Sequence, residues 1–213
     1  MEDNLNIYLI RHGRQASKLC NVNVELAEEG IKQAALLSKR MKFYPLDGIY
    51  SSQLIRAVQT AEIINQNHQL IHEVRPELEE IDFGDLTGHT DEYIEEHYSE
   101  FFAKMNKCEE DLPYPGGESG KEVYDRAMRI INEIIESDKE EVAVVTHGGV
   151  IRALVAELMG AGLARRGRFA RALENTSITN IHYNRETETF YLQSFNDVAH
   201  LEEEPTLMRR FWK

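Results

Sequence analysis

The 213-residue chain has only two cysteines, Cys20 and Cys108. Two thiols cannot form a disulfide framework or a four-cysteine zinc site, so we expect both to be reduced. No run of 18 apolar residues is present, and no segment is therefore expected to span a membrane. The first residues, MEDNLN, are acidic and lack the cationic start and apolar run of a signal peptide. We expect a cytoplasmic location.

Basic residues are also scarce, with 24 Lys and Arg against 37 Asp and Glu and a formal net charge of −13. Nucleic-acid-binding proteins usually carry a basic surface, so general binding to DNA or RNA is disfavoured. An acidic protein also repels anionic membranes and anionic substrates on average. An anionic substrate would therefore need cations gathered at its own site.

Hydrophobic residues make up 42% of the chain and charged residues 29%, which is an ordinary globular composition, and the length predicts one domain over residues 1–213. Apolar and β-branched runs predict strands at residues 5–10, 49–51, 70–74, 141–146, 176–183 and 189–194. Apolar residues at helical spacing predict helices at residues 28–42, 53–67, 90–106, 119–137 and 149–159. Strands that alternate with helices predict a three-layer α/β fold, a mostly parallel sheet flanked by helices.

Two of the predicted helices have particular features. The helix over residues 119–137 is expected to begin with a capping box, in which Ser119 is the cap and Glu122 its partner. The weakly amphipathic helix over residues 90–106 lies in a stretch, about 85–112, that we expect to form a small helical insertion. Its aromatic residues fit either a cap that selects substrate or ordinary packing; they are Tyr93, Tyr98, Phe101 and Phe102.

Histidine and arginine side chains follow three of the predicted strands. Arg11 and His12 follow the first strand, His147 follows the strand at residues 141–146, and Arg56 comes one turn into the helix after the second strand. Open α/β sheets bind ligands at the carboxyl ends of their strands, so these side chains are expected to converge. Taken singly, each also fits a plain structural role, such as a turn histidine or an exposed helix arginine.

Such a cluster suits phosphate chemistry. The planar guanidinium of Arg matches phosphate oxygens, and a helix start behind each glycine supplies N–H donors. A neutral imidazole can attack phosphorus and form a covalent intermediate, while the flanking cations offset charge on the transferring oxygens. A nearby carboxylic acid would then protonate the leaving alkoxide.

Six segments resemble, in order, the motifs of the histidine phosphatase superfamily (phosphoglycerate mutase-like, branch 1). They are LIRHG at residues 9–13, YSSQLIRAVQTA at 50–61, EIDFGDLTG at 80–88, PGGES at 115–119, THGGVIR at 146–152 and NDVAHL at 196–201. The match covers about residues 5–201. It implies a phosphoglycerate mutase-like fold and a reaction without cofactor or metal, because cationic side chains take the electrostatic role of a metal.

The resemblance implies a role for each residue of the cluster. His12 would be the nucleophile that becomes phosphohistidine. Arg11, Arg56 and His147 would hold the phosphoryl group, and the backbone N–H of Gly148 would add a donor.

The general acid comes from a crowded acidic stretch. The resemblance selects Glu80, which would protonate the leaving group and then activate water, whereas the residues alone leave Glu79 as a competitor. Asp82 is expected to cap or support the loop, and Glu118 to cap a helix rather than contact substrate.

The residues after LIRHG depart from the family pattern. Members usually carry an acidic residue, a Thr or Ser and an Asn where this chain has Arg14, Gln15 and Lys18. Gln15 is expected to bind substrate through its amide, with Asn21 or Asn23 as substitutes. Arg14 and Lys18 place two cations at the entrance, and these differences bear on the substrate rather than on the reaction class.

The sequence thus predicts a metal-independent phosphatase that hydrolyses small phosphate monoesters through a phosphohistidine on His12. The short stretch before Gly30 favours hydrolysis over phosphate transfer between two positions. Two alternatives stay open: a phosphoglycerate mutase-type phosphotransferase, and a non-catalytic module that binds a phosphorylated ligand. A dinucleotide oxidoreductase is disfavoured because no Gly-x-Gly-x-x-Gly follows the first strand.

Other polar groups have simpler interpretations. His68 and His72 are four residues apart, but a helix end and a strand start fall between them, so we expect surface histidines rather than a metal site. Four arginines between residues 165 and 171 form a basic cluster that fits a solvated loop or an anion-attracting rim. No heptad pattern indicates an oligomeric state, and a homodimer stays open.

Overall fold

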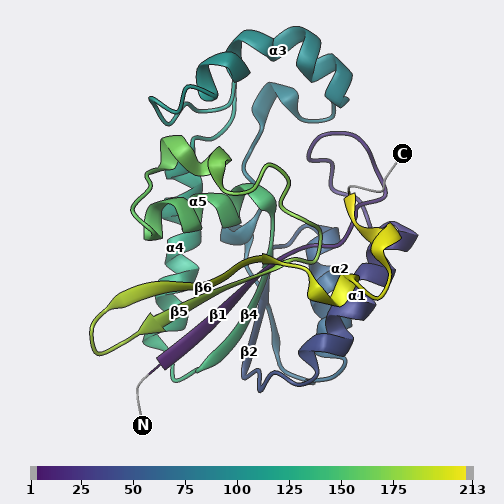
Figure 1. The fold of residues 1–213 in the computed structure, drawn as a ribbon, viewed down its shortest axis with the longest axis vertical. Helices are drawn as coiled ribbons and strands as arrows, with labels where there is room; N and C mark the ends of the chain where they lie inside the picture. Colours follow the sequence, from purple (N-terminus) through teal and green to yellow (C-terminus); the bar gives the residue numbers. More distant parts are fainter. Residues whose placement is uncertain (1–3, 210–213) are drawn as a thin grey trace.

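A six-stranded sheet forms the centre of the computed structural model, which describes residues 4–209 (Figure 1). The strand order is β3-β2-β4-β1-β5-β6. Strands β1, β4, β2 and β3 pair in parallel, whereas β5 is antiparallel to both of its neighbours. The strands are β1 (Asn4–Arg11), β2 (Gly48–Ser51), β3 (His72–Val74), β4 (Glu141–Thr146), β5 (Ile178–Asn184) and β6 (Thr189–Asp197). The predicted α/β fold with a mostly parallel sheet is confirmed.

Helices flank the sheet on both faces (Figure 1). They are α1 (Glu28–Met41) and α2 (Ile55–Asn65) on one face, and α4 (Gly120–Glu136) and α5 (Gly148–Leu158) on the other.

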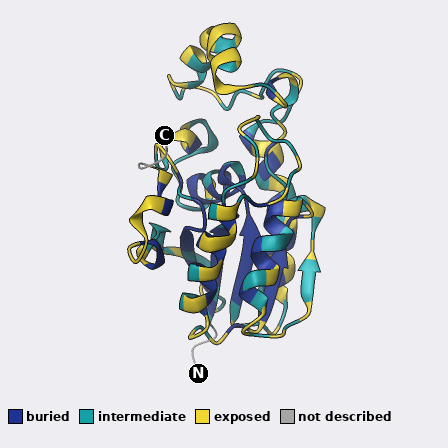
Figure 2. Cartoon of the chain, turned by 90° about the vertical axis from the view of Figure 1, so that its right-hand side faces the viewer, coloured by how far each residue is buried: buried dark blue, intermediate teal, exposed yellow. Residues whose placement is uncertain are grey.

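Alternation along β1 explains the three layers, because successive strand side chains point to opposite faces. Leu5, Ile7 and Leu9 belong to the apolar cluster under α4 and α5, whereas Tyr8 and Ile10 belong to the cluster under α1 and α2. The buried sheet between its helices is dark blue in Figure 2. Both faces of this strand are apolar, as expected for a strand covered on both sides.

Turn geometry shifts some of the predicted boundaries. The strand predicted at residues 70–74 shortens to β3, because Gln69 has a positive φ of 57° and the Asn65 side chain accepts from and donates to the backbone of Leu70. The capping box is confirmed: the Ser119 side chain accepts from the backbone of Glu122, and the Glu122 side chain accepts in return.

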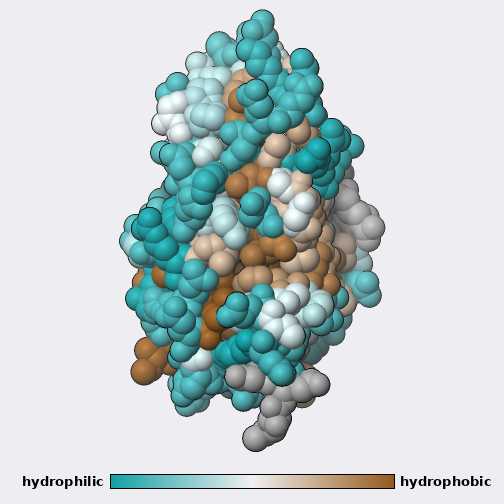
Figure 3. Space-filling model, turned by 90° about the vertical axis from the view of Figure 1, so that its left-hand side faces the viewer, coloured by the Kyte–Doolittle hydropathy of each residue, from teal (hydrophilic) through white to brown (hydrophobic). Residues whose placement is uncertain are grey.

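The segment predicted as a helical insertion contains α3 (Asp91–Met105), which lies apart from the sheet at the top of Figure 1. None of its residues, all of which the structure describes, is buried, and the helix is kinked at Tyr98. The surface at this end is largely hydrophilic on the face in Figure 3. Phe101 of α3 packs against Tyr114, in the loop before α4, with ring centroids 5.5 Å apart. Among the described helices, none has the length and apolar character needed to cross a membrane.

Candidate active site

The two histidine segments meet because their strands are neighbours. Arg11 at the end of β1 is paired in register with Thr146 at the end of β4. The backbone N–H of His12 donates to the carbonyl of Thr146 at 3.0 Å. The rings of His12 and His147 lie 4.9 Å apart, centroid to centroid. The site therefore forms at the carboxyl ends of the parallel strands, where the sequence places it.

The His12 ring is held in one tautomer. Its Nδ1 lies 2.6 Å from the carbonyl oxygen of Gly13, which can only accept, so Nδ1 carries the proton. Nε2 is then unprotonated, and its lone pair accepts from Nε of Arg56 at 3.2 Å. Burial, followed by the charges of Arg56 and Arg11, holds the pKa of His12 well below its usual value. The imidazole is neutral at neutral pH, as an attacking nitrogen must be.

His147 is fully buried beside His12 and is not among the described residues that line either cavity. Its Nε2 lies 2.6 Å from Oγ of Ser52, a residue that follows β2, and its Nδ1 is buried without a hydrogen-bond partner in the described part of the chain. Burial and then the nearby His12 lower the pKa of His147 well below its usual value. Since buried polar atoms are normally paired, the unpaired Nδ1 sets His147 apart from an ordinary core residue.

Two guanidinium groups, those of Arg11 and Arg56, place positive charge beside His12. Arg11 donates Nη1 to the carbonyl of Leu173, while its buried Nε has no partner among the described residues. Arg56 is 1% exposed and donates Nη2 to the Asn21 side chain at 3.0 Å. Burial and then the charge of Arg209 lower the pKa of Arg11 to about 9. Fixed, poorly hydrated cations of this kind suit a phosphoryl group.

Glu80 lies at the N-terminus of α5, on the side facing Arg11. Its Oε1 accepts from the backbone of Gly149 at 2.8 Å and of Ile81 at 3.0 Å. A Cβ at position 149 would lie 2.4 Å from this oxygen, so only glycine permits the approach. A Cβ on Gly148 would lie 3.7 Å from Nε of Arg11 and 4.0 Å from Oε2 of Glu80. Gly148, at the helix start, therefore lies between the Glu80 carboxylate and the Arg11 guanidinium.

Arg126 and Glu118 hold in place the segment that carries Glu80, residues 77–82, which we call the acid loop. Arg126 on α4 pairs with Glu118 at 2.9 Å. Arg126 also donates to three backbone carbonyls of the acid loop, those of Glu77, Glu79 and Glu80. Glu118 in turn accepts from the backbone of Asp82 at 2.9 Å. The interpretation of Glu118 as a helix cap is wrong because the neighbouring Ser119 makes that cap; Glu118 ties the acid loop to α4 instead.

Replacing Arg126 with Met is expected to lower kcat on an alkyl phosphate by about 10²-fold, because the loop carbonyls lose their donors and Glu80 moves. KM should change little, since Arg126 is not among the residues predicted to hold the phosphoryl group. The matched control is Arg129→Met, an exposed arginine one turn along α4. Steady-state kinetics with a urea unfolding curve for each variant checks this, and a wild-type kcat in Arg126→Met would contradict it.

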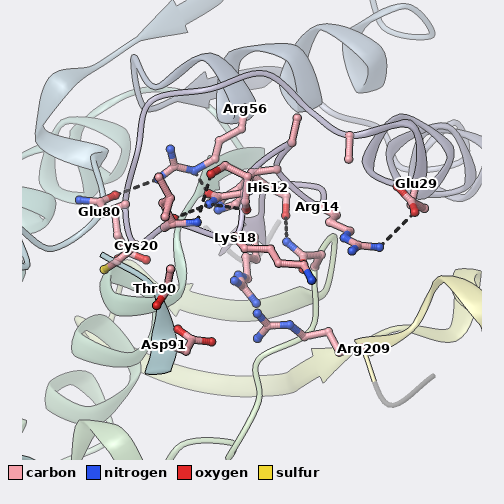
Figure 4. A pocket seen from close by; sticks show the side chains of 18 of the residues that line it. His12, Arg14, Lys18, Cys20, Glu29, Arg56, Glu80, Thr90, Asp91 and Arg209 are labelled. Carbon is pink, nitrogen blue, oxygen red and sulfur yellow. Dashed lines mark hydrogen bonds and ion pairs between the residues drawn. The ribbon is translucent and has the colours of Figure 1, made fainter. Parts of the chain in front are cut away.

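The site opens into a cavity of about 870 Å³, bounded by the loop at residues 14–21 and by residues 90–92 (Figure 4). Gln15 lines this cavity, and its amide donates to the carbonyls of Ser17 and Leu19 at 3.1 Å each. Its amide thus shapes the entrance loop, and a contact with substrate stays a prediction.

The other residues named after LIRHG divide between entrance and support. Arg14 and Lys18 both line the cavity, and Arg14 also pairs with Glu29 at 3.1 Å. Asn21 lines it too and holds Arg56 in place. Asn23 instead accepts from the backbone of Ile55, at the start of α2.

The sequence did not predict that residues 175 and 176 would contact the backbone of Arg11 and His12. Asn175 donates its side-chain amide to the His12 carbonyl at 2.8 Å, and the backbone of Thr176 donates to the Arg11 carbonyl at 2.9 Å. His200, in the NDVAHL segment, lies 3.1 Å from Oγ1 of Thr176. These contacts join loops with no periodic pattern, so no signal in the sequence marks them.

Two arginines near the site were also missed. Arg152 lies within the THGGVIR segment but was given no role, and it follows Gly148 by one turn of α5. Arg209 enters from the C-terminal segment and points into the first cavity (Figure 4).

The remaining predicted groups do not form a single site. In the basic cluster, Arg165 is exposed, Arg166 is buried against Asp111, and Arg168 lines a second cavity. His68 and His72 are both half-buried rather than on the surface, and Nε2 of His72 lies 2.8 Å from Oγ of Ser51.

Acid is expected to destabilise the fold through its buried histidines. Burial and the charge of Arg40 lower the pKa of His200 to about 4, against about 6.5 in the unfolded chain, so the unfolded state binds more protons between these values. The free energy of unfolding should therefore fall as pH drops below about 6.5, by about 1.4 kcal/mol per pH unit for each such histidine. His12 and His147, with their lowered pKa values, act in the same direction.

The measurement is urea unfolding at about pH 7.5 and about pH 5.5 for the wild type and for His200→Asn. The variant should lose less stability between the two conditions, by about 1 kcal/mol. Equal losses would mean that His200 is charged in the folded protein.

Comparison with known proteins identifies the family. A sequence model described as the histidine phosphatase superfamily (branch 1) matches residues 7–198. The chain is 33% identical to the metal-independent phosphoserine phosphatase of Arabidopsis thaliana, over 96% of this chain and 87% of that protein. It is 34% identical to phosphoserine phosphatase 1 of Hydrogenobacter thermophilus, over 74% of each.

Solved structures show the same fold. The mycobacterial glucosyl-3-phosphoglycerate phosphatase in complex with inorganic phosphate superimposes with a TM-score of 0.80 at 26% identity, over 92% of this chain and 99% of that chain. The phosphoserine phosphatase of Entamoeba histolytica, solved with phosphoserine, gives 0.78 at 26% identity, also over 92% and 99%. The chain therefore belongs to branch 1 of the histidine phosphatase superfamily and has its phosphoglycerate mutase-like α/β fold.

Proposed function

We propose that the chain hydrolyses small phosphate monoesters through a phosphohistidine on His12, without a metal. The observation that carries this proposal is the state of His12. Its Nδ1 is fixed on the Gly13 carbonyl, and its unprotonated Nε2 accepts from Arg56, with the charge of Arg11 and the ring of His147 close by. Attack on phosphorus requires an unprotonated ring nitrogen, and fixed cations beside it suit the charge on the transferring oxygens.

The reaction would take two steps. Nε2 of His12 forms a bond to phosphorus as the ester P–O bond breaks, and protonated Glu80 gives its proton to the leaving oxygen. The Glu80 carboxylate then takes a proton from water, whose oxygen attacks phosphorus as the N–P bond breaks. Phosphate leaves and His12 is neutral again. Arg11 and Arg56 supply positive charge to the transferring oxygens in both steps.

The relatives support a small phosphorylated substrate. Those named above are phosphatases of phosphoserine and of glucosyl-3-phosphoglycerate. A second candidate, a mutase-type phosphotransferase, has one observation in its favour: the chain is 31% identical over 98% of its length to phosphoglycerate mutase-like protein 4 of Arabidopsis thaliana. Both candidates share the phosphohistidine and differ in what accepts the phosphoryl group.

The test is to trap the intermediate in the presence of chelator. The protein is mixed with a radiolabelled aryl phosphate and quenched in alkaline detergent, and protein-bound label is then exposed to acid and to alkali. Label that is lost in acid but kept in alkali, together with phosphate release, supports the proposal. Exchange between two phosphoglycerates without phosphate release would favour the mutase, and neither label nor release would overturn both.

A further inference from the structure

A second cavity of about 330 Å³ continues from the catalytic site. It shares part of its wall with the first cavity, including Arg11, Glu80 and Phe83. His12 and Arg56 line the first cavity but are not among the described residues that line the second. Because Glu80 would deliver its proton to the leaving oxygen, a cavity that starts at Glu80 and excludes the nucleophile is placed to hold the leaving group.

The second cavity is strongly cationic in an acidic chain. Its described lining carries a single carboxylate, that of Glu80, against five guanidinium groups. They belong to Arg11, Arg152, Arg166, Arg168 and Arg209. The chain as a whole has a net charge of −13, so this local excess of positive charge runs against its composition. A cavity of one sign of charge concentrates ligands of the opposite sign.

Arg152 has a donor directed at this space. Its Nε and Nη2 donate to the carbonyls of Phe169 and Ala170, at 3.0 and 3.2 Å, which fixes the plane of the guanidinium. Its Nη1 makes no hydrogen bond to residues 4–209 and lies 3.4 Å from where a Cβ on Gly148 would be. Burial lowers the pKa of Arg152, and the charge of the nearby Glu80 carboxylate opposes this shift. The guanidinium is therefore preorganised to bind an anion.

Arg166, which also lines this cavity, already has a carboxylate partner. Arg166 pairs with Asp111 and donates to the carbonyls of Leu112 and Leu163. Phe83 and Tyr114 also line this cavity and form an edge-to-face pair with centroids 4.7 Å apart. The cavity thus combines a fixed cation with an aromatic wall, and its volume limits the ligand to a small one.

We propose that the second cavity binds an acidic group carried by the leaving group of the substrate, and that Arg152 is the residue that selects for it. This inference rests on the proposed phosphatase function. The acidic group is a carboxylate or a second phosphate, since either accepts from the exposed edge of a guanidinium. Substrates of this class keep a negative charge on the alcohol after phosphate has left.

The test compares pairs of esters that differ only in the acidic group. One pair is O-phosphoserine and O-phosphoethanolamine, which differ by a carboxylate. The other is a short diol bisphosphate and its monophosphate. We expect the wild type to prefer the acidic member of one pair by at least about tenfold in kcat/KM, and the preferred pair identifies the acidic group. In Arg152→Met that preference should fall by about tenfold to hundredfold, as for loss of a charged hydrogen bond.

Controls separate this proposal from general damage. Arg165→Met removes the same charge from an exposed position that is not among the described residues lining either cavity, and it should keep the wild-type preference. Arg152→Lys keeps the charge but not the planar fork, and it should retain part of the preference. This variant provides the test if Arg152→Met does not fold.

Two outcomes would overturn the proposal while leaving the phosphatase function intact. They are equal kcat/KM values within both pairs for the wild type, and an unchanged preference in folded Arg152→Met. Failure of the wild type to release phosphate from all of these esters and from an aryl phosphate would instead overturn the proposed function itself.

Discussion

Replacing His12 with Asn is expected to lower the rate of phosphate release by at least about 10⁴-fold, because removal of an enzyme's nucleophile costs this much or more. Asn is polar and smaller than His, so it fits the site without burying a new charge. It has no ring nitrogen in the place of Nε2, which accepts from Arg56 in the wild type. The residual rate would then come from binding and electrostatic stabilisation alone.

The measurement is phosphate release from an aryl phosphate in chelator, at saturating substrate. A matched control is His182→Asn, on β5, a histidine that is not among the described residues lining either cavity. The control should retain the wild-type rate, and both variants should unfold at similar urea concentrations. If His12→Asn released phosphate at the wild-type rate, the nucleophile would have to be another group.

The meeting of the two histidines could be predicted from the sequence because it depends on short-range patterns. An apolar strand followed by a polar residue and glycine occurs twice, and parallel strands end at the same edge of a sheet. The register of Arg11 with Thr146 follows directly from this arrangement. The approach of the two histidine segments is thus largely a consequence of strand order.

The contacts that support the site could not be predicted in the same way. Asn21 and Thr176 both have positive φ values, 46° and 57°, which their residue types do not demand. Asn21 holds Arg56, and Thr176 contacts Arg11 and His200. Such contacts depend on how unrelated loops pack against each other, and a single sequence has no periodic signal for that.

The choice between Glu79 and Glu80 shows the same limit at a single position. The two residues have the same chemistry, so composition cannot rank them. In the structure, Glu80 accepts from the backbone of Gly149 and lines both cavities, whereas Glu79 is not among the described residues that line either one. What distinguishes Glu80 from Glu79 is therefore a backbone donor at the start of α5, 69 positions away in the sequence.

Replacing Glu80 with Gln is expected to slow hydrolysis of an alkyl phosphate by about 10²- to 10⁴-fold, the usual contribution of a general acid. An aryl phosphate, whose leaving group needs less protonation, should lose much less in the first step. Its phosphohistidine should then accumulate, because the amide of the variant cannot take a proton from the attacking water. A burst of alcohol release followed by slow phosphate release would show this, and Glu79→Gln, at the adjacent position, is the matched control.

The pH dependence of the same reaction follows from two opposite requirements. His12 must be neutral to attack, and its lowered pKa keeps it neutral well below its usual range, so the nucleophile does not limit the rate at mildly acidic pH. Glu80 must carry a proton in order to donate one, which is the opposite requirement from that of His12. The rate on an alkyl phosphate should therefore peak at or below neutral pH and fall in alkali, and Glu80→Gln should remove that alkaline fall. A wild-type rate that still rises in strong alkali would contradict the role of Glu80, because no carboxylic acid would then be supplying the proton.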